Sequence, residues 1–325
     1  MLNLPRIRVN PVPRPHPYFC AVGNLDKIID QVLGWAATHE FLGDAVPGYQ
    51  ITFAPDHFAA LLGADIRFHP DSPDTAWVEP FVTDWDEADI RFNSAGPWWE
   101  RTVACIRAFR GRCDGKLIIS GTQLQGGLDC LAAIRGVNEL LLDIVDCPDK
   151  VLNALAAVDH ALHEVRRALV KELNVAEFGS LTRHGLYSTG ILDVPQCDFS
   201  AMISPEMFRK FGLPSLRKEV TSLDAAEYHL DGPDAIKHLE AICEIEKISV
   251  IQWQPGAGEA AEKDWTWLYQ KIDALGKGTV RPAAKDKIPD IWRQSQSKHL
   301  YFSTLVISEK EMAELIHECL SKYLG

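Results

Sequence analysis

The hydrophobic pattern of the last hundred residues alternates between two periods. Short runs rich in β-branched and aromatic residues are each followed by a segment with the apolar spacing of an amphipathic helix. Strands are predicted at 227–231, 249–253, 278–283 and 299–304, and the helices that follow them at 233–245, 263–275, 286–296 and 308–324. Such consecutive strand–helix units predict a parallel sheet with helices packed against it.

The rest of the chain repeats this rhythm less regularly. Strands are predicted at 49–54 and 116–121, strand-like pieces at 175–178, 184–190 and 195–199, and helices at 24–42, 97–111, 127–145, 148–173 and 204–223, with Pro214 kinking the last of them. About eight strands in all predict the α/β class and a single (β/α)8 TIM barrel. An open doubly wound sheet is the alternative, but no GxGxxG follows a strand and no Walker-type loop occurs, which disfavours its nucleotide-binding form.

Two segments stand outside this rhythm. Residues 1–44 hold a Pro-rich extension and one helix, and we expect them to pack on a barrel formed by residues 45–325. Residues 64–98 form a long loop that contains Trp77, Trp85, Trp98 and Trp99. Such a connection is compatible with a lid or site wall and equally with a loop packed across the end of the barrel.

Composition narrows the class of protein. The formal net charge of -12 repels phosphate backbones, so nucleic acid is not an expected partner. No apolar stretch is long enough to span a membrane, and the N-terminus lacks an apolar core of signal-peptide type. The 8 cysteines form no CxxC pair and mostly lie in apolar helical patterns, so a reducing cytoplasm is the expected location.

The end of the strand at 227–231 carries the most informative pair of side chains. His229 and Asp231 are two residues apart, so both leave the same face of the strand. At the C-terminal mouth of a barrel they could share a metal ion, or act as a general base and its orienting partner. A purely structural pair that closes the turn at Gly232-Pro233 is the alternative.

Other polar side chains fall at or near predicted strand ends. We expect substrate-binding roles for Gln123, His184, Tyr187, Gln196, Gln252, Trp253 and Arg281, a catalytic role for Asp198 beside His229 and Asp231, and a third metal ligand in Glu259. Arg281 is the natural binder of a substrate carboxylate. The alternatives are a polar network at the barrel end for Gln196 and Asp198, and a first-turn carboxylate favoured by the helix dipole for Glu259.

Several segments resemble the uroporphyrinogen decarboxylase superfamily, which also contains corrinoid-dependent methyltransferases. The resemblance runs from about residue 45 to the end, on GADIRF and the Trp-rich loop, LAAIRGVNELLLDIVDCPDKV, SPEMFRKFGLPSLRKEV and YHLDG. It implies a single barrel of eight strands and helices. The Arg-rich N-terminal motif of true decarboxylases is missing, so the methyltransferase-like branch is favoured.

That branch is expected to bind zinc through His-x-Cys on one strand and a Cys on the last strand, and to activate a thiol. Here the first motif reads His229-Leu230-Asp231, and Ser303 or Thr304 stands near the last position. A His/Asp site is harder and less thiophilic than a His/Cys/Cys site, so the thiol activation of that branch is not expected to carry over unchanged. Zinc or another divalent ion, held together with water and Glu259, is the expected cofactor, and a site that holds no metal is the alternative.

The residues and the resemblance together leave three candidate functions, of which the first is favoured. The first is methyl transfer between a small-molecule substrate and a corrinoid protein or pterin acceptor. The second is a metal-free decarboxylase, with Arg281 holding a carboxylate and Asp198 or His229 supplying a proton. The third is a non-catalytic binding barrel.

Overall fold

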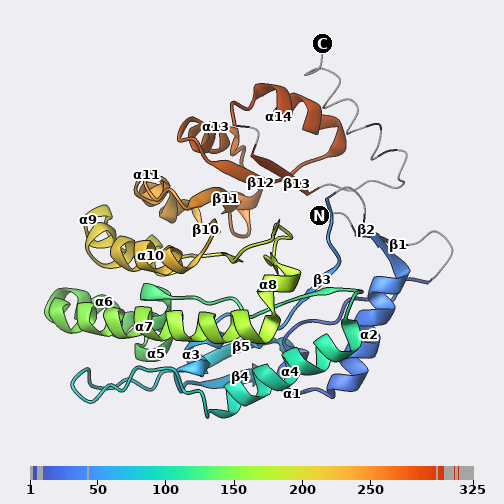
Figure 1. Cartoon of the computed structure of the whole chain (residues 1–325). Coiled ribbons are helices and arrows are strands. Elements are labelled where there is room, and N and C mark those ends of the chain that lie inside the picture. The colour runs from blue at the N-terminus through green and yellow to red at the C-terminus, as the bar shows by residue number, and fades with distance from the viewer. Residues whose placement is uncertain are drawn as a thin grey trace.

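The computed structural model describes residues 3–5, 10–41, 44–297, 299–303, 311 and 314, and its centre is a parallel sheet. The strand order is β13-β12-β11-β10-β9, and each neighbouring pair is parallel. The strands span Leu192–Asp193 (β9), Ala225–Asp231 (β10), Ile248–Gln254 (β11), Gly278–Pro282 (β12) and Leu300–Ser303 (β13). Figure 1 shows them with helices on their outer side.

The helices between these strands confirm the strand–helix units, with some shorter than expected. They are η4 (Pro233–His238) with α11 (Leu239–Cys243), α12 (Glu259–Glu262) with α13 (Thr266–Ala274), and η5 (Lys285–Lys287) with α14 (Ile288–Gln294). The helix expected at 308–324 lies almost wholly outside the described residues. Gly232 takes a φ of +77° at the turn after β10, which explains why glycine follows Asp231.

The N-terminal segment contacts the helix α4 (Pro97–Cys113), where Arg101 donates to the Cys20 and Gly23 carbonyls. A short antiparallel pair joins β1 (Asn3–Pro5) to β2 (His39–Phe41). Between them lie α1 (Phe19–Val22) and α2 (Leu25–Thr38), and the Asn24 side chain caps α2 by accepting from the Lys27 N–H, as the sequence predicts. The Tyr49 hydroxyl donates to the Pro15 carbonyl, and this hydrogen bond holds the Pro-rich segment before α1 against Tyr49.

A second parallel pair, β3 (Gly48–Gln50) with β6 (Ile118–Ser120), lies beyond β7 from the central sheet. Between its strands come α3 (His57–Leu61), the antiparallel hairpin of β4 (Asp65–His69) and β5 (Ser72–Glu79), and α4 (Pro97–Cys113). The expected irregular loop therefore begins with a hairpin. Trp85 donates to Asp143, and Trp98 and Trp99 contact Phe53 and Phe92, so these three indoles pack on the body.

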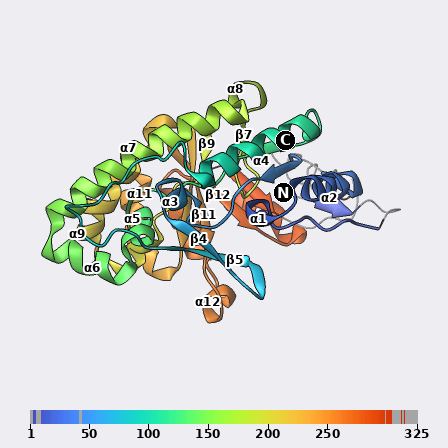
Figure 2. The ribbon, with the colours of Figure 1, turned by 90° about the horizontal axis from the view of Figure 1, so that it is seen from below.

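The middle of the chain is helical. It contains α5 (Gly127–Arg135), α6 (Val137–Asp146), α7 (Pro148–Leu173) and α8 (Val175–Phe178). The single helix predicted at 127–145 is thus two, because Gly136 breaks it with a φ of +107°. The strand predicted at 175–178 was wrong, since α8 continues the helical path after Asn174 turns left-handed. Figure 2 shows the long α7 running along the outside of the strands.

Short elements lead from α7 to β10. Strands β7 (Ser180–Leu181) and β8 (Tyr187–Ser188) pair antiparallel, and residues 198–202 form the 3-10 helix η1 where a strand was expected at 195–199. The helix predicted from 204 is α9 (Pro205–Met207), the π-helical turn η2 (Phe208–Gly212), α10 (Leu213–Glu219) and the short η3 (Val220–Ser222). The wide turn lies just before Pro214, which lacks the N–H that a regular helix needs there.

The two faces of the central strands differ in chemistry. On β10, Tyr228 and Leu230 are each 1% exposed and belong to the hydrophobic core, whereas Glu227, His229 and Asp231 leave the opposite face. The register places Gln252 beside His229 and Gln254 beside Asp231. One face of the sheet therefore binds the helices, and the other gathers polar groups.

Candidate functional site

The centre of the site is the last part of β10. His229 and Asp231 point from the same face, as the sequence predicts, and His229 Nε2 lies 4.0 Å from Asp231 Oδ2. Asp198 from η1 joins them, and one potential ligand atom of each of these three residues lies within 4.8 Å of the others. A bridge between Gln196 and His229 brings the segment before η1 alongside β10.

Gln252 fixes the orientation and tautomer of His229. The Gln252 amide nitrogen donates to the Trp253 carbonyl, so its oxygen is the acceptor that faces His229 Nδ1. His229 Nδ1 therefore carries the proton, and the lone pair of Nε2 is directed toward Asp231. Burial, with Arg183 nearby, lowers the pKa of His229 to about 4, so the ring is neutral at pH 7.

Gln196 connects Asp198 with the neighbouring strands. Its amide nitrogen donates to Asp198 Oδ2 at 2.7 Å, and its oxygen accepts from Gln123 and from Arg183 Nη2. The side chain is 5% exposed, so these bonds satisfy an amide that would otherwise be costly to bury. Asp129 holds the backbone of the same segment, since it accepts from the Asp198 and Phe199 N–H groups.

The two aspartates share a partly desolvated environment. Burial raises the pKa of Asp198 above its usual range even though solvent reaches the side chain, and the nearby carboxylates Asp129 and Asp231 add to the rise. Burial also raises the pKa of Asp231, and Arg183 opposes this. Carboxylates crowded in this way favour a proton or a cation between them.

A second layer of polar groups lies one step deeper along β10. His184 Nδ1 pairs with Glu227 Oε1 at 2.6 Å, and the His184 ring stacks on that of His229 with centroids 5.9 Å apart. Arg183 Nε donates to His184 Nε2. Within the described residues, Glu227 Oε2 and Arg183 Nη1 are buried without a hydrogen-bond partner.

Arg183 and Glu227 were missed by the sequence analysis. Glu227 precedes His229 by two residues, so the alternation of a strand places both on one face and could have identified it. Arg183 stands directly before His184, but its role depends on its hydrogen bond to Gln196 and on the nearby charge of Glu227. No spacing rule encodes these long-range relations. Burial, with Asp56 nearby, raises the pKa of Tyr18 in the N-terminal segment to about 12, and Arg183 opposes this.

The sequence-predicted residues divide into two groups. The structure brings together His229, Asp231, Asp198, Gln123, His184, Gln196 and Gln252. It places Trp253, Arg281, Tyr187 and Glu259 elsewhere.

Those four residues lie on outer faces or on the exposed surface. Trp253 and Arg281 alternate with the polar face of their strands, so Trp253 packs on Trp265 and the Arg281 guanidinium lies 4.0 Å from the Tyr269 ring centroid. Tyr187 is 44% exposed on β8. Glu259 is exposed on α12, which Figure 2 shows projecting from the body.

The last strand adds no further ligand in the described residues. Strand β13, of sequence LYFS, contains no His, Cys, Asp or Glu, and it ends at Ser303 beside Pro282. Thr304 lies outside the described residues.

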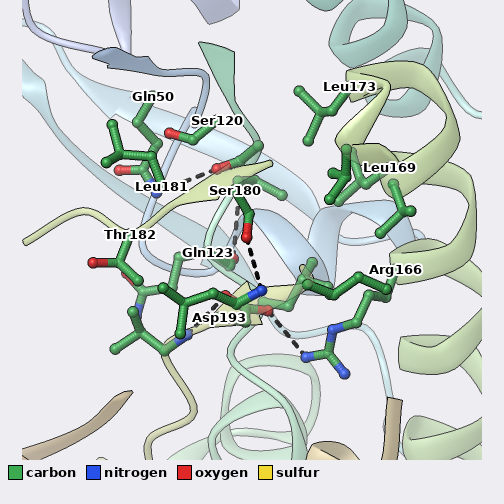
Figure 3. A pocket seen from close by; sticks show the side chains of 18 of the residues that line it. Gln50, Ser120, Gln123, Arg166, Leu169, Leu173, Ser180, Leu181, Thr182 and Asp193 are labelled. Carbon is green, nitrogen blue, oxygen red and sulfur yellow. Dashed lines mark hydrogen bonds and ion pairs between the residues drawn. The ribbon is translucent and has the colours of Figure 1, made fainter. Parts of the chain in front are cut away.

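A cavity of about 70 Å³ adjoins the site between α7 and the strands β6, β7 and β9. Figure 3 shows Leu169 and Leu173 on its helical side and Ser180 and Thr182 on its strand side. Gln123 and Arg183 line both this cavity and the polar cluster. The titratable groups of β10 do not line it, so the candidate chemistry belongs to the cluster.

Comparison with known proteins identifies the fold. The chain is similar in structure to a methyltransferase from Methanosarcina mazei, with a TM-score of 0.62 over 96% of this chain and 88% of that chain. The two sequences are 13% identical, so the similarity concerns the fold alone. No family model matches the chain. No curated protein matches it either. No helix in the described part of the chain is both long and apolar enough to cross a membrane.

Proposed function

We propose that the chain is an enzyme of the methyltransferase-like branch of the uroporphyrinogen decarboxylase superfamily. It moves a methyl group between a small-molecule substrate and a corrinoid protein or pterin acceptor in the cytoplasm. The observation that carries the proposal is the convergence of His229, Asp231 and Asp198 at the end of a parallel strand. The shared fold with a methyltransferase supports it as well.

The proposed architecture is a (β/α)8 barrel formed by residues 45–325, with residues 1–44 packed against it. The eight strands would be β3, β6, β7, β9, β10, β11, β12 and β13. Contacts between β6 and β7 and between β7 and β9 support this order, since they connect the two parallel sheets. The cluster then occupies the C-terminal mouth, where barrel enzymes carry their chemistry.

The side chains have distinct tasks in this proposal. Methyl transfer to a nucleophile releases the proton of that nucleophile, so the site needs a base or an ion that lowers the nucleophile's pKa. His229 presents a neutral Nε2 lone pair for either purpose, and Asp231 lies 4.0 Å away. When bound there, a divalent ion would act as a Lewis acid on the substrate. Gln252 keeps His229 in the required tautomer.

Substrate binding falls to the side chains around this pair. Gln123, Gln196 and Arg183 form one connected wall of hydrogen-bonding groups. His184 forms another beneath His229. Arg281 and Trp253 have no place in this wall, because they leave the opposite face of their strands.

A decarboxylase is the second candidate, and Arg183 is the observation that favours it. The Nη1 group of Arg183 is buried without a partner among the described residues, so it could hold a substrate carboxylate beside His229. In this role Arg183 replaces Arg281, which packs on Tyr269.

Methyl transfer can be tested with methylcobalamin as the donor. Purified protein is incubated with methylcobalamin and separate panels of small alcohols, phenols, thiols and amines, and loss of the methyl–cobalt absorbance is followed. We expect turnover with at least one panel, and at least about a hundredfold loss in H229A because a positioned base or ligand is removed. H160A changes an exposed helical histidine and should retain the activity.

The same samples separate the rivals. Release of carbon dioxide from a panel of carboxylic acids, undiminished by chelator and without demethylation, would replace the methyltransferase with the decarboxylase. Absence of both activities in protein that remains folded would leave the non-catalytic barrel.

A further inference from the structure

The three potential ligands of the cluster are spaced for a single ion. Divalent metals lie about 2.0–2.2 Å from imidazole nitrogen and carboxylate oxygen, so two ligands of one ion are separated by about 4 Å or less. The separation of 4.0 Å between His229 Nε2 and Asp231 Oδ2 meets this condition. Asp198 completes a set whose atoms all lie within 4.8 Å of one another, which requires only a small side-chain adjustment.

Two of these ligands are already oriented by neighbouring amides. Gln252 holds His229 through Nδ1, which leaves Nε2 for an ion, and Gln196 holds one oxygen of Asp198, which leaves the other. Such outer hydrogen bonds are typical of metal sites because they fix the direction of each ligand. Glu259 has no comparable connection: it is exposed on α12 and outside the cluster.

The donor set contains no sulfur. Among the described residues, the group that could hold a metal consists of one imidazole and two carboxylates, with no cysteine thiol in it. The resemblance described above implies a zinc site with two thiolates that activates a thiol, and these residues do not fit that site. Carboxylate oxygens favour harder ions, and two carboxylates neutralise a divalent charge without thiolates.

We propose that Asp198, His229 and Asp231 form a one-histidine, two-carboxylate site for an oxygen-preferring divalent ion, and that its substrate coordinates through oxygen rather than through a thiol. Solvent reaches Asp198, so the ion keeps an open side for this oxygen donor. The substrate class is therefore an alcohol, phenol or carboxylate. This inference rests on the proposed location of the reacting centre, but it does not require that a methyl group be transferred.

Metal titration tests the ligand set. Isothermal titration of the full chain with Mn²⁺ should give one site, which D198N and H229A weaken by at least about a hundredfold, since they remove a direct ligand. E259Q is the matched control and should bind as the unchanged protein does. Thermal unfolding of each variant without metal verifies that it remains folded.

Cobalt substitution tests the donor atoms. The Co²⁺-loaded protein should show d–d bands but no sulfur-to-cobalt charge-transfer band, and C197S should have the same spectrum, since Cys197 is the cysteine next to Asp198. Acetate or phenol should shift the d–d bands, whereas 2-mercaptoethanol should not create a charge-transfer band at concentrations where the oxygen probes have saturated.

Each contrary result has a definite meaning. Weak binding in E259Q with normal binding in D198N would overturn Asp198 as the third ligand, and so would the absence of Mn²⁺ and Co²⁺ binding in folded protein. A thiolate band with the added thiol would overturn the oxygen-donor substrate. Methylcobalamin turnover is measured without these probes, so the proposed function can stand or fail independently.

Discussion

Hydrogen bonds to neighbouring residues determine which side-chain atoms of the site remain available for chemistry. Gln252 illustrates this, because its amide nitrogen is committed to the Trp253 carbonyl and its oxygen must therefore accept from His229. That choice determines which imidazole nitrogen faces Asp231. A substitution of Gln252 that places a donor opposite Nδ1 would move the imidazole proton to Nε2. Nε2 would then have no lone pair with which to accept a proton or bind an ion.

The buried His57 leads to a pH-dependent prediction at the residue scale. Burial lowers the pKa of His57 to about 3, and its ring bonds to the Phe53 N–H and the Thr102 hydroxyl. Below the unfolded pKa of about 6.5 the unfolded chain binds a proton that the native ring refuses, so stability falls as the pH is lowered from 6.5 toward 3. H57Q should remove about 1.4 kcal/mol per pH unit of that slope.

Urea unfolding at intervals between pH 7.5 and 4 measures this slope. At pH 7.5 the pH dependence of the unfolding free energy should be the same for H57Q and the unchanged chain. The unfolding free energy of H57Q should already be lower there. H160Q, which changes an exposed helical histidine, serves as the control and should retain the original slope. Parallel curves for H57Q and the unchanged chain would show that His57 is not held neutral in the native state.

Sequence spacing identified the site residues only where a simple rule connects them. The two-residue period of a strand placed His229 and Asp231 together, and the same rule would have put Arg281 and Trp253 on the outer face once the strand boundaries were known. Asp198 was named on a strand but acts from a 3-10 helix. Its approach to His229 depends on long-range packing, which one sequence does not encode locally.

At the scale of elements, hydrophobic periodicity predicted helices well and short strands poorly. Long amphipathic stretches such as α7 have enough turns to display the 3.6-residue period. Strands such as β7 and β9 contain only two residues, so they show no alternation and depend on their neighbours. The break between α5 and α6 was missed because a glycine inside a helical pattern is compatible with a continuous helix.

Gly136 provides the test at this scale. Its φ of +107° and ψ of +137° suit glycine, and an added Cβ would also meet the Glu139 side chain. G136A should therefore cost about 1–3 kcal/mol of unfolding free energy. G111A lies inside α4 with open space around the added methyl group and should instead stabilise by about 0.5–1 kcal/mol. Equal effects of the two changes in chemical denaturation would contradict the assigned break.

At the scale of the whole molecule, the strand–helix rhythm predicted the α/β class and the parallel order of the C-terminal strands. That rhythm did not predict which side chains hold α7 against the strands. Arg166 on α7 is 4% exposed and bonds to Asp193 on β9, to Glu219 at the end of α10 and to Ser222. A cation so placed joins three segments far apart in the sequence, and its apolar neighbours along α7 give no hint of the partners.

Replacing Arg166 measures how strongly this junction supports the fold. R166M should cost about 3–5 kcal/mol, since Glu219 would remain buried with no countercharge. The double variant R166M/E219L should recover part of that loss, because two apolar side chains replace the pair. R107M removes an exposed arginine of α4 that pairs with Glu172 of α7 and should change stability little. Urea unfolding followed by fluorescence and circular dichroism gives the four free energies. A double variant less stable than R166M would show that the arginine contributes through packing and not by neutralising Glu219, so the junction would be apolar in origin.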